Sequence, residues 1–163
     1  MRKVLKISLI ILLIAFIVIQ FIRPSKNASP EITANQIEAK HQMPENVQEI
    51  LKVSCYNCHS NTSHNPWYWY VQPIAWVLDN HIKEGKRELN FSTFSTYPAW
   101  RRYKKFKEID KEVKSGDMPI YSYTLLHRNA VLNAGQKLAI ENWVISSKKE
   151  MEAQYSPDSL KAR

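Results

Sequence analysis

The only two cysteines of the chain lie three positions apart in the segment "SCYNCHS", and a histidine directly follows the second one. On a helical turn, this spacing places the thiols of Cys55 and Cys58 on adjoining sides, with the imidazole of His59 beside them. Two such thiols can bond to the two vinyl groups of a porphyrin, while the histidine binds the iron from one face. The motif therefore predicts covalent haem c (iron), and a fold that encloses a large, flat, apolar group.

Three other uses of these residues remain open. Cys55 and Cys58 could form a plain disulfide in an oxidising compartment, or a redox pair of the thioredoxin type. The redox pair normally belongs to a fold with strands, and the sequence shows no alternating strand pattern. A zinc site could use both cysteines with His59 and His64, but structural zinc sites usually separate their ligand pairs by about a dozen residues or more. We favour haem.

A sixth ligand for the iron has to come from another part of the chain. Met118, in "SGDMPIYSY", comes two residues after a glycine and directly before a proline, a setting typical of a rigid loop. Methionine sulfur is one usual axial ligand, and it raises the reduction potential. We expect Met118 in this position, with His127 as the second candidate and His64 and His81 as weaker ones. The alternative is that Met118 only fills the core.

The N-terminal segment is a nearly continuous apolar run. Residues 4–22, "VLKISLIILLIAFIVIQFI", contain one charge, Lys6. A helix of this length can just cross the hydrocarbon core of a bilayer, and no small-residue cleavage site accompanies it. We therefore expect residues 1–22 to be a single transmembrane helix of the inner membrane, with the C-terminal domain in the periplasm. A cleaved signal peptide is the alternative.

The remainder of the chain is predicted to be all-α. Only three glycines occur in 163 residues, and eight prolines punctuate the chain, which favours helices joined by turns. Residues 23–43 are polar, contain two prolines and are expected to be a linker. We expect residues 44–147 to form the haem-binding domain and residues 148–163 to be a charged tail.

Four segments of the domain show apolar residues at helical spacing. They are residues 44–54, 73–85, about 98–115 and a segment that begins at Asn133. We expect the helix before the cysteines to pack on the helix after Asn133. The predicted helix ends are Gly85 for the second helix and Gly116 for the third. The apolar faces are expected at Val47, Ile50, Leu51, Ile74, Val77, Leu78, His81, Ile82, Phe106, Ile109, Val113, Ile140, Trp143 and Val144.

Charge and aromatic content suggest partners and cavity walls. The formal net charge of +8 would suit nucleic acid, anionic lipid or an acidic protein, but no nucleic-acid motif occurs, so nucleic acid is not expected. The stretch "WRRYKKFK", residues 100–107, is expected to be a solvated helix face, with docking of an acidic redox partner or of anionic lipid as a second interpretation. Aromatic rings are natural walls for a porphyrin. The candidates are Trp67, Tyr68, Trp69, Tyr70 and Trp76.

The order of the motifs resembles that of the bacterial haem-binding domain family. The resemblance covers roughly residues 44–147 and rests on CYNCHSN, the PWY that follows, EGKRELNFS, the GDMP loop and the closing Trp143. It implies an exported, often membrane-anchored domain with a single c-type haem. It further implies that Cys55 and Cys58 hold the haem, that His59 is the proximal ligand and that Met118 is the distal one.

Together these features predict a small, c-type cytochrome-like helical domain behind an N-terminal membrane helix. We expect its function to be one-electron transfer by a carrier that is not an enzyme. Two other classes stay open at this point. A labile sixth ligand would favour a haem enzyme or sensor that binds peroxide or a gas, and free thiols at Cys55 and Cys58 would favour a thiol–disulfide protein.

Overall fold

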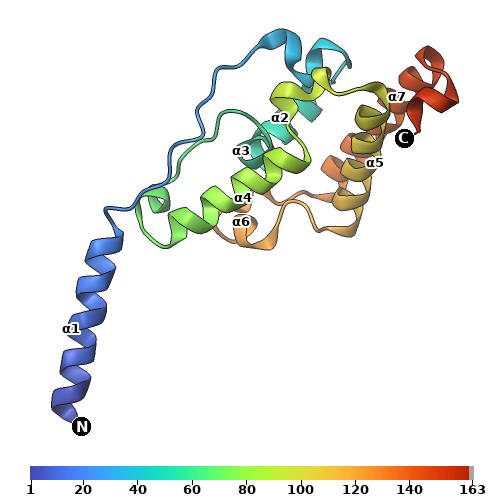
Figure 1. Cartoon of the computed structure of the whole chain (residues 1–163). Coiled ribbons are helices and arrows are strands. Elements are labelled where there is room, and N and C mark those ends of the chain that lie inside the picture. Colours follow the sequence, from blue (N-terminus) through green and yellow to red (C-terminus); the bar gives the residue numbers. More distant parts are fainter. Residues whose placement is uncertain (162–163) are drawn as a thin grey trace.

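The computed structural model describes residues 1–161, and these residues form helices and connecting loops without a β-strand (Figure 1). The all-α prediction is therefore confirmed for this part of the chain. The α-helices are α1 (Arg2–Ile19), α2 (Glu45–Ser54), α3 (Tyr56–His59), α4 (Ile74–Glu88), α5 (Ala99–Ser115), α6 (Tyr121–Leu126) and α7 (Ala134–Gln154). The short 3-10 helices are η1 (Thr33–Asn35), η2 (Ile37–Ala39), η3 (Trp67–Tyr70), η4 (Phe91–Thr96), η5 (Arg128–Ala130) and η6 (Pro157–Leu160).

The prediction of a membrane-spanning helix is wrong. Within residues 1–161, the structure contains no helix that combines the length and the apolar character needed to cross a membrane. Helix α1 projects away from the domain (Figure 1) and ends at Ile19, before the apolar run is complete. Its first turns carry Arg2, Lys3 and Lys6, so its uncharged part rises only about 20 Å, against a hydrocarbon core of about 30 Å.

A cluster of buried apolar side chains includes residues of α2, α5 and α7. The rings of Phe106 and Trp143 meet edge to face with centroids 5.4 Å apart, and Phe106 is fully buried. Leu51 of α2 and Ile140 of α7 are also fully buried, and these two helices are in contact, as predicted. Burial of each large apolar side chain stabilises the fold by about 1.5–3 kcal/mol.

Two of the predicted helix boundaries are confirmed and one is wrong. Gly116 ends α5 in the left-handed conformation, at φ 83°. Asn133 begins α7 through a capping box with Gln136, in which each side chain accepts a hydrogen bond from the other residue's backbone N–H. Gly85, by contrast, lies inside α4, which continues to Glu88.

The predicted inward face of α4 is also wrong in part. Ile82 is buried as expected, together with Ala75, but Ile74 and Val77 are 43% and 55% exposed. The helix is therefore rotated about its axis relative to the expectation. The reason is tertiary, because α4 packs on α3 and η3, and these contacts select the side of the helix that is buried.

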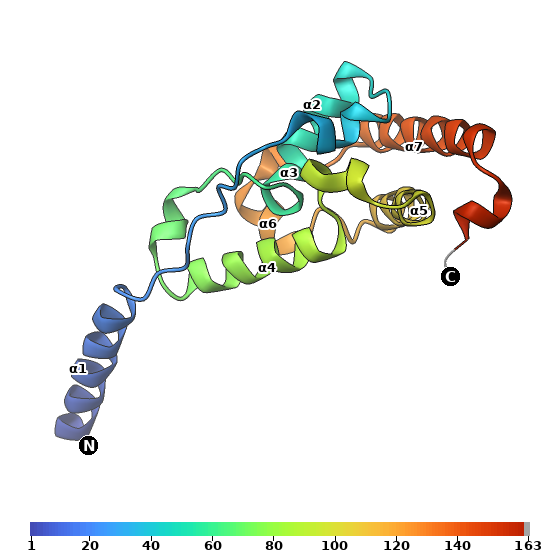
Figure 2. The same ribbon diagram turned by 45° about the horizontal axis from the view of Figure 1, so that its top comes forward.

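The segment expected to be a linker crosses the domain as an ordered strap, which we define as residues 27–41 (Figure 2). The side chain of Asn27 donates hydrogen bonds to the backbone oxygen of Ser60 at 2.9 Å and to the hydroxyl of Ser63 at 2.8 Å. At the other end of the strap, Ile37 is fully buried and His41 is only 3% exposed. The strap thus supplies part of the core.

The segment expected to be a charged tail also packs on the domain. Helix α7 extends through it to Gln154, and Met151 is buried. The hydroxyl of Tyr155 accepts a hydrogen bond of 2.9 Å from Arg102, and η6 contacts α5. The last two residues of this segment, 162–163, lie outside the described residues.

Candidate functional site

Two adjoining cavities, of about 430 and 350 Å³, lie between α3, α4, the last turns of α5 and the loop that follows α5. Cys55, His59 and Met118 line both cavities, and Cys58 lines the smaller one. The structure thus brings the four predicted site residues to one place. Each volume lies within the range of about 300–1,000 Å³ that is typical of ligand pockets.

The two cysteines sit at the junction of two helices. Cys55 interrupts the path from α2 to α3 with φ −127° and ψ −42°, and its carbonyl accepts hydrogen bonds from the backbone N–H groups of Cys58 and His59. Both cysteines have free thiols. Burial raises the pKa of Cys55 to about 12 and that of Cys58 to about 11. Neither thiol therefore shows the lowered pKa that is typical of thiol–disulfide catalysis.

His59 is oriented by the backbone at the end of α4. Its Nδ1 lies 2.9 Å from the carbonyl oxygen of Leu89, which can only accept, so Nδ1 carries the proton. This leaves the lone pair on Nε2. Burial lowers the pKa of His59, although the carbonyls of Leu89 and Gly85 act in the opposite direction. The ring is therefore suited to the neutral form, in which histidine binds metals.

Gly85 explains how α4 comes close enough to hold His59. A Cβ atom at this position would lie 2.8 Å from the carbonyl oxygen of Cys58 and 3.3 Å from its Cβ. Any side chain would push α4 away from the cysteine turn, and the Leu89 carbonyl would move with it. The glycine that the sequence suggested as a helix end is instead a point of close approach between helices.

Met118 reaches the cavities from the loop that follows the Gly116 turn. Its backbone N–H donates a hydrogen bond of 3.1 Å to the carbonyl of Glu112, which ties the loop to the last turns of α5. Pro119 follows and lines both cavities as well. Met118 is half-buried. Its sulfur-bearing side chain is therefore available to a ligand between α3 and this loop.

The other histidines that the sequence suggested as sixth ligands are placed differently. The ring of His127 is hydrogen-bonded to the hydroxyl of Tyr68, stacks on Tyr123 with centroids 4.2 Å apart and lines neither cavity. His64 is exposed. His81 does line the smaller cavity, together with His59 and Met118. His81 is therefore a better alternative to Met118 than His127 or His64. The sequence pattern did not show this order.

The predicted aromatic walls are wrong as a group. Tyr68 and Trp69 are buried and Trp67, Tyr70 and Trp76 are exposed, but these five side chains line neither of the two cavities. The larger cavity has aliphatic walls and one aromatic ring instead. These walls are Leu51, Leu89, Phe91, Ile109, Val113 and Leu132. The helical spacing of Ile109 and Val113 was the signal that could have identified part of this set.

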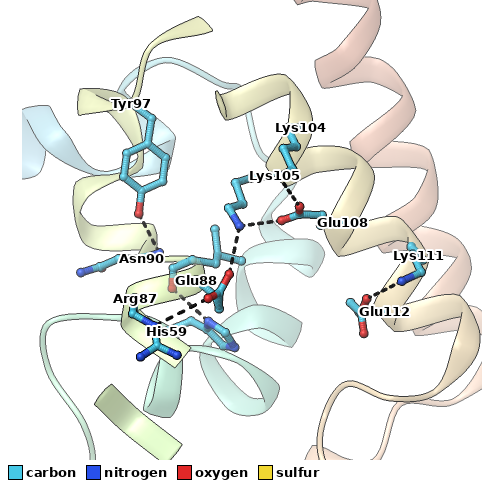
Figure 3. A network of polar contacts seen from close by, with 11 residues as sticks. His59, Arg87, Glu88, Asn90, Tyr97, Lys104, Lys105, Glu108, Lys111 and Glu112 are labelled. Atoms are coloured by element: carbon cyan, nitrogen blue, oxygen red, sulfur yellow. Dashed lines mark hydrogen bonds and ion pairs between the residues drawn. The ribbon is translucent and has the colours of Figure 1, made fainter. Parts of the chain in front are cut away.

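Several side chains of the polar network in Figure 3 also line the larger cavity, among them Glu88, Lys105 and Glu108. Lys105 of α5 is buried, and its ammonium lies 2.6 Å from a carboxylate oxygen of Glu108 and 3.7 Å from one of Glu88 on α4. Arg102, one turn earlier, is buried too. The stretch predicted to be a solvated basic face is therefore divided, because two of its cations point into the protein. One of these, Lys105, places a positive charge beside the cavity.

The zinc interpretation finds no support in the geometry. Within residues 1–161, no group of three or more histidine, cysteine, aspartate or glutamate side chains is arranged to hold a metal ion. Cys55 and His59 instead border the larger cavity, whose walls are mainly apolar. Aliphatic walls fit a large apolar group such as a haem better than they fit a bare divalent cation.

These features define a class of protein, a small helical domain in which free thiols, a neutral histidine and a methionine surround an apolar cavity. A family model described as a haem-binding domain matches residues 14–146, from the second half of α1 to the middle of α7. The chain belongs to this haem-binding domain family. No curated protein and no solved structure matches the chain.

Proposed function

We propose that this domain binds its haem covalently, as haem c, and carries single electrons. The observation that carries the proposal is the smaller cavity, which is lined by both thiols, by His59 and by Met118. Cysteine, histidine and methionine, the residue types that attach haem c and bind its iron, thus meet at one cavity of suitable size. When bound, the haem supplies an iron that alternates between the ferrous and ferric states.

The roles of the chain follow from the positions of these residues. Cys55 and Cys58 would hold the haem through thioether bonds, each thiol giving its sulfur to one carbon of a vinyl group and its proton to the other, without any oxidant. His59 would hold the iron through Nε2, which is left free because Nδ1–H donates its hydrogen bond to the Leu89 carbonyl. Met118 would supply its sulfur to the same iron, from a loop tied to α5 by the hydrogen bond between the Met118 backbone N–H and the Glu112 carbonyl. The aliphatic walls exclude water.

The location and partners of the domain are part of the same proposal. We place it in the periplasm, where covalent attachment would prevent loss of the cofactor, with a membrane surface and an acidic redox protein as partners. The net charge of +8 supports both anionic partners. Fractionation of cells that express the protein would test the location, because haem-bearing chain recovered only from the cytoplasm would contradict it.

The covalent bond is tested by mass and by colour. The protein is to be produced in a host that attaches haem c, extracted with acid acetone and weighed intact. We expect the mass of the chain plus one haem, and a red protein after extraction. The variant with both Cys55→Ala and Cys58→Ala should lose the haem during extraction. A wild-type mass equal to that of the bare chain would refute the proposal.

The sixth ligand is tested by comparing three variants. Met118→Ala should change the visible spectrum toward that of a five-coordinate iron, whereas His127→Ala should leave it unchanged because that ring lies outside both cavities. Met118 and His81 both line the smaller cavity with His59, and His81→Ala shows which of the two binds the iron. A spectrum that responds to His81→Ala and ignores Met118→Ala would assign the ligand to His81. Ready uptake of carbon monoxide by the wild type would favour a sensor or enzyme instead.

A further inference from the structure

One end of the domain leaves a group of large apolar side chains exposed. Trp67 is 75% exposed, Val77 is 55% exposed and Leu126 is 56% exposed. We define the apolar end face as this trio together with its exposed neighbours on η3, α4 and α6. The additional members are Tyr70, Ile74, Trp76 and Leu125. A small groove of about 100 Å³ joins the two helices of this face, and Ile74, Val77 and Leu126 line it.

Helix α1 leaves the domain at the same end, beside η3 and the start of α4 (Figure 1). Hydrogen bonds fix this junction. The side chain of Gln20 donates to the carbonyl of Gln72 at 3.2 Å and accepts from its backbone N–H at 2.9 Å. The indole of Trp76 donates to the carbonyl of Ile22 at 2.9 Å. The apolar end face and α1 are therefore held together, so that a surface that contacts one is close to the other.

The exposure pattern of α1 indicates what kind of partner covers this end. Ile7, Leu9, Ile10 and Ile11 are all more than half exposed, although successive residues point about 100° apart around a helix. A groove on a protein covers one side of a helix, whereas lipid chains can cover several sides, even of a helix that does not cross the bilayer. Apolar side chains that are exposed all round α1 therefore favour a lipid partner over a protein partner.

Charge and aromatic residues agree with a lipid surface. Arg2, Lys3 and Lys6 lie in the first turns of α1, while Arg23 and Lys26 follow its other end. These cations suit the anionic headgroups of a membrane. The end face adds indole and phenol side chains, which are enriched where hydrocarbon meets water.

We propose that the apolar end face rests on an anionic lipid surface, beside α1, and so orients the domain on the membrane. This inference rests on the membrane partner suggested above, and it adds the part of the domain that contacts lipid. The groove of this face is also bordered by Cys58 and His81, which line the smaller cavity. The proposed cofactor site and the lipid surface would then be neighbours.

The test uses the full chain and flotation with vesicles of phosphatidylethanolamine and phosphatidylglycerol. The face variant carries Trp67→Gln, Val77→Gln and Leu126→Gln. Its matched control carries Leu138→Gln and Ile145→Gln, two exposed apolar residues of α7. We expect the face variant to partition at least about tenfold more weakly than the wild type, because three apolar side chains lose their lipid contact. The control should stay within about twofold of the wild type.

The outcomes separate this inference from the proposal on which it rests. Wild-type chain that does not float would refute the membrane partner, and the apolar end face with it. Equal flotation of the wild type and the face variant would overturn only the role of the face. Equal binding to vesicles that lack phosphatidylglycerol would overturn the proposal that the lipid surface has to be anionic.

The face variant is useful only if it folds, which its helical circular dichroism spectrum reports. If the triple variant is unfolded, hydrogen exchange of the wild-type chain provides the same test. Vesicles should slow amide exchange in residues 67–77 and leave the exchange of α7 unchanged. Unchanged exchange in residues 67–77 on vesicles that hold the protein would overturn the inference.

Discussion

The two halves of the domain are held together in different ways. In the packed half, formed by α5, α7, η4 and the strap, aromatic rings meet directly, with Phe94, Phe106 and Trp143 in consecutive edge-to-face contacts. In the cavity half, α3, α4 and the loop after α5 border the two cavities, and Lys105 of α5 reaches Glu88 of α4 only at 3.7 Å. The difference indicates that the chain alone stabilises the first half, while the second depends on what fills its cavities.

The largest expected effect tests the independence of the packed half. Phe106→Ala removes a fully buried ring and should lower the free energy of unfolding by about 3–5 kcal/mol. If the packed half is independent, the loss is the same with haem and in the Cys55→Ala/Cys58→Ala form that cannot attach it. Chemical denaturation of both forms measures this. A loss that appears in only one form would show that the halves are not separable.

The second effect is a pH dependence that belongs to the packed half. Burial, the Arg102 guanidinium and Lys40 lower the pKa of His41 from 6.5 to about 4. Between these values the unfolded chain binds the proton and the folded chain does not, so stability falls as the pH drops from 6.5 to 4. The expected loss is about 3 kcal/mol at its maximum.

His41→Gln should remove this component of the pH dependence. Thermal unfolding measured at a series of pH values from 7 to 4 would show it as a flatter profile for the variant. Parallel profiles for the two proteins would indicate that His41 does not carry the effect.

The third effect concerns the cavity half. Gly85→Ala would place a methyl group 2.8 Å from the Cys58 carbonyl, and overpacking of this kind costs about 1–3 kcal/mol. Because α4 also holds His59 through Leu89, we expect a lower fraction of haem-bearing chain and a shifted reduction potential. Intact mass and potentiometry measure these two quantities.

Gly135→Ala is the matched control for this substitution, since its Cβ would meet only the Asn133 side chain, at 3.3 Å. The control should keep the haem content and the potential of the wild type. If both alanine variants behave alike, close approach at Gly85 is not what positions α4.

The smallest expected effect lies at the boundary between the halves. Lys105→Met removes a buried cation from the wall of the larger cavity. Loss of a nearby positive charge destabilises the reduced iron. The free energy of reduction should become less favourable by about 1 kcal/mol, which lowers the reduction potential by roughly 40 mV for one electron. Lys104→Met is the control, because Lys104 is 58% exposed. Equal potentials for both variants would place Lys105 too far away to matter.

Local signals in the sequence predicted the parts of the fold that local chemistry determines. The Asn133 capping box, the Gly116 turn and the spacing of Phe106, Ile109 and Val113 each depend on residues within one or two helical turns. The same holds for Cys55, Cys58 and His59, whose relative positions one short turn dictates. Met118 lines both cavities on a loop that a turn and a proline define, and its role as an iron ligand stays a prediction.

The features that the sequence did not reveal depend on tertiary contacts. An isolated α4 has no preferred partner, so its apolar periodicity could not show that Ile74 and Val77 face outward. The strap looked like a linker because its polar composition hides two core residues, Ile37 and His41. The cavity walls were missed for a similar reason, because Phe91 and Leu132 come from loops and short turns whose positions no helical pattern predicts.

The strap has a practical consequence for anyone who wishes to study the globular region alone. A truncated version that begins at Pro44 would look reasonable from hydropathy, yet it would expose the surfaces that Ile37 and His41 cover and would free Ser60 and Ser63 from Asn27. Recombinant versions should therefore start upstream of Asn27. Poor yield from a shorter version would reflect a missing piece of the interior, and would say nothing about the haem.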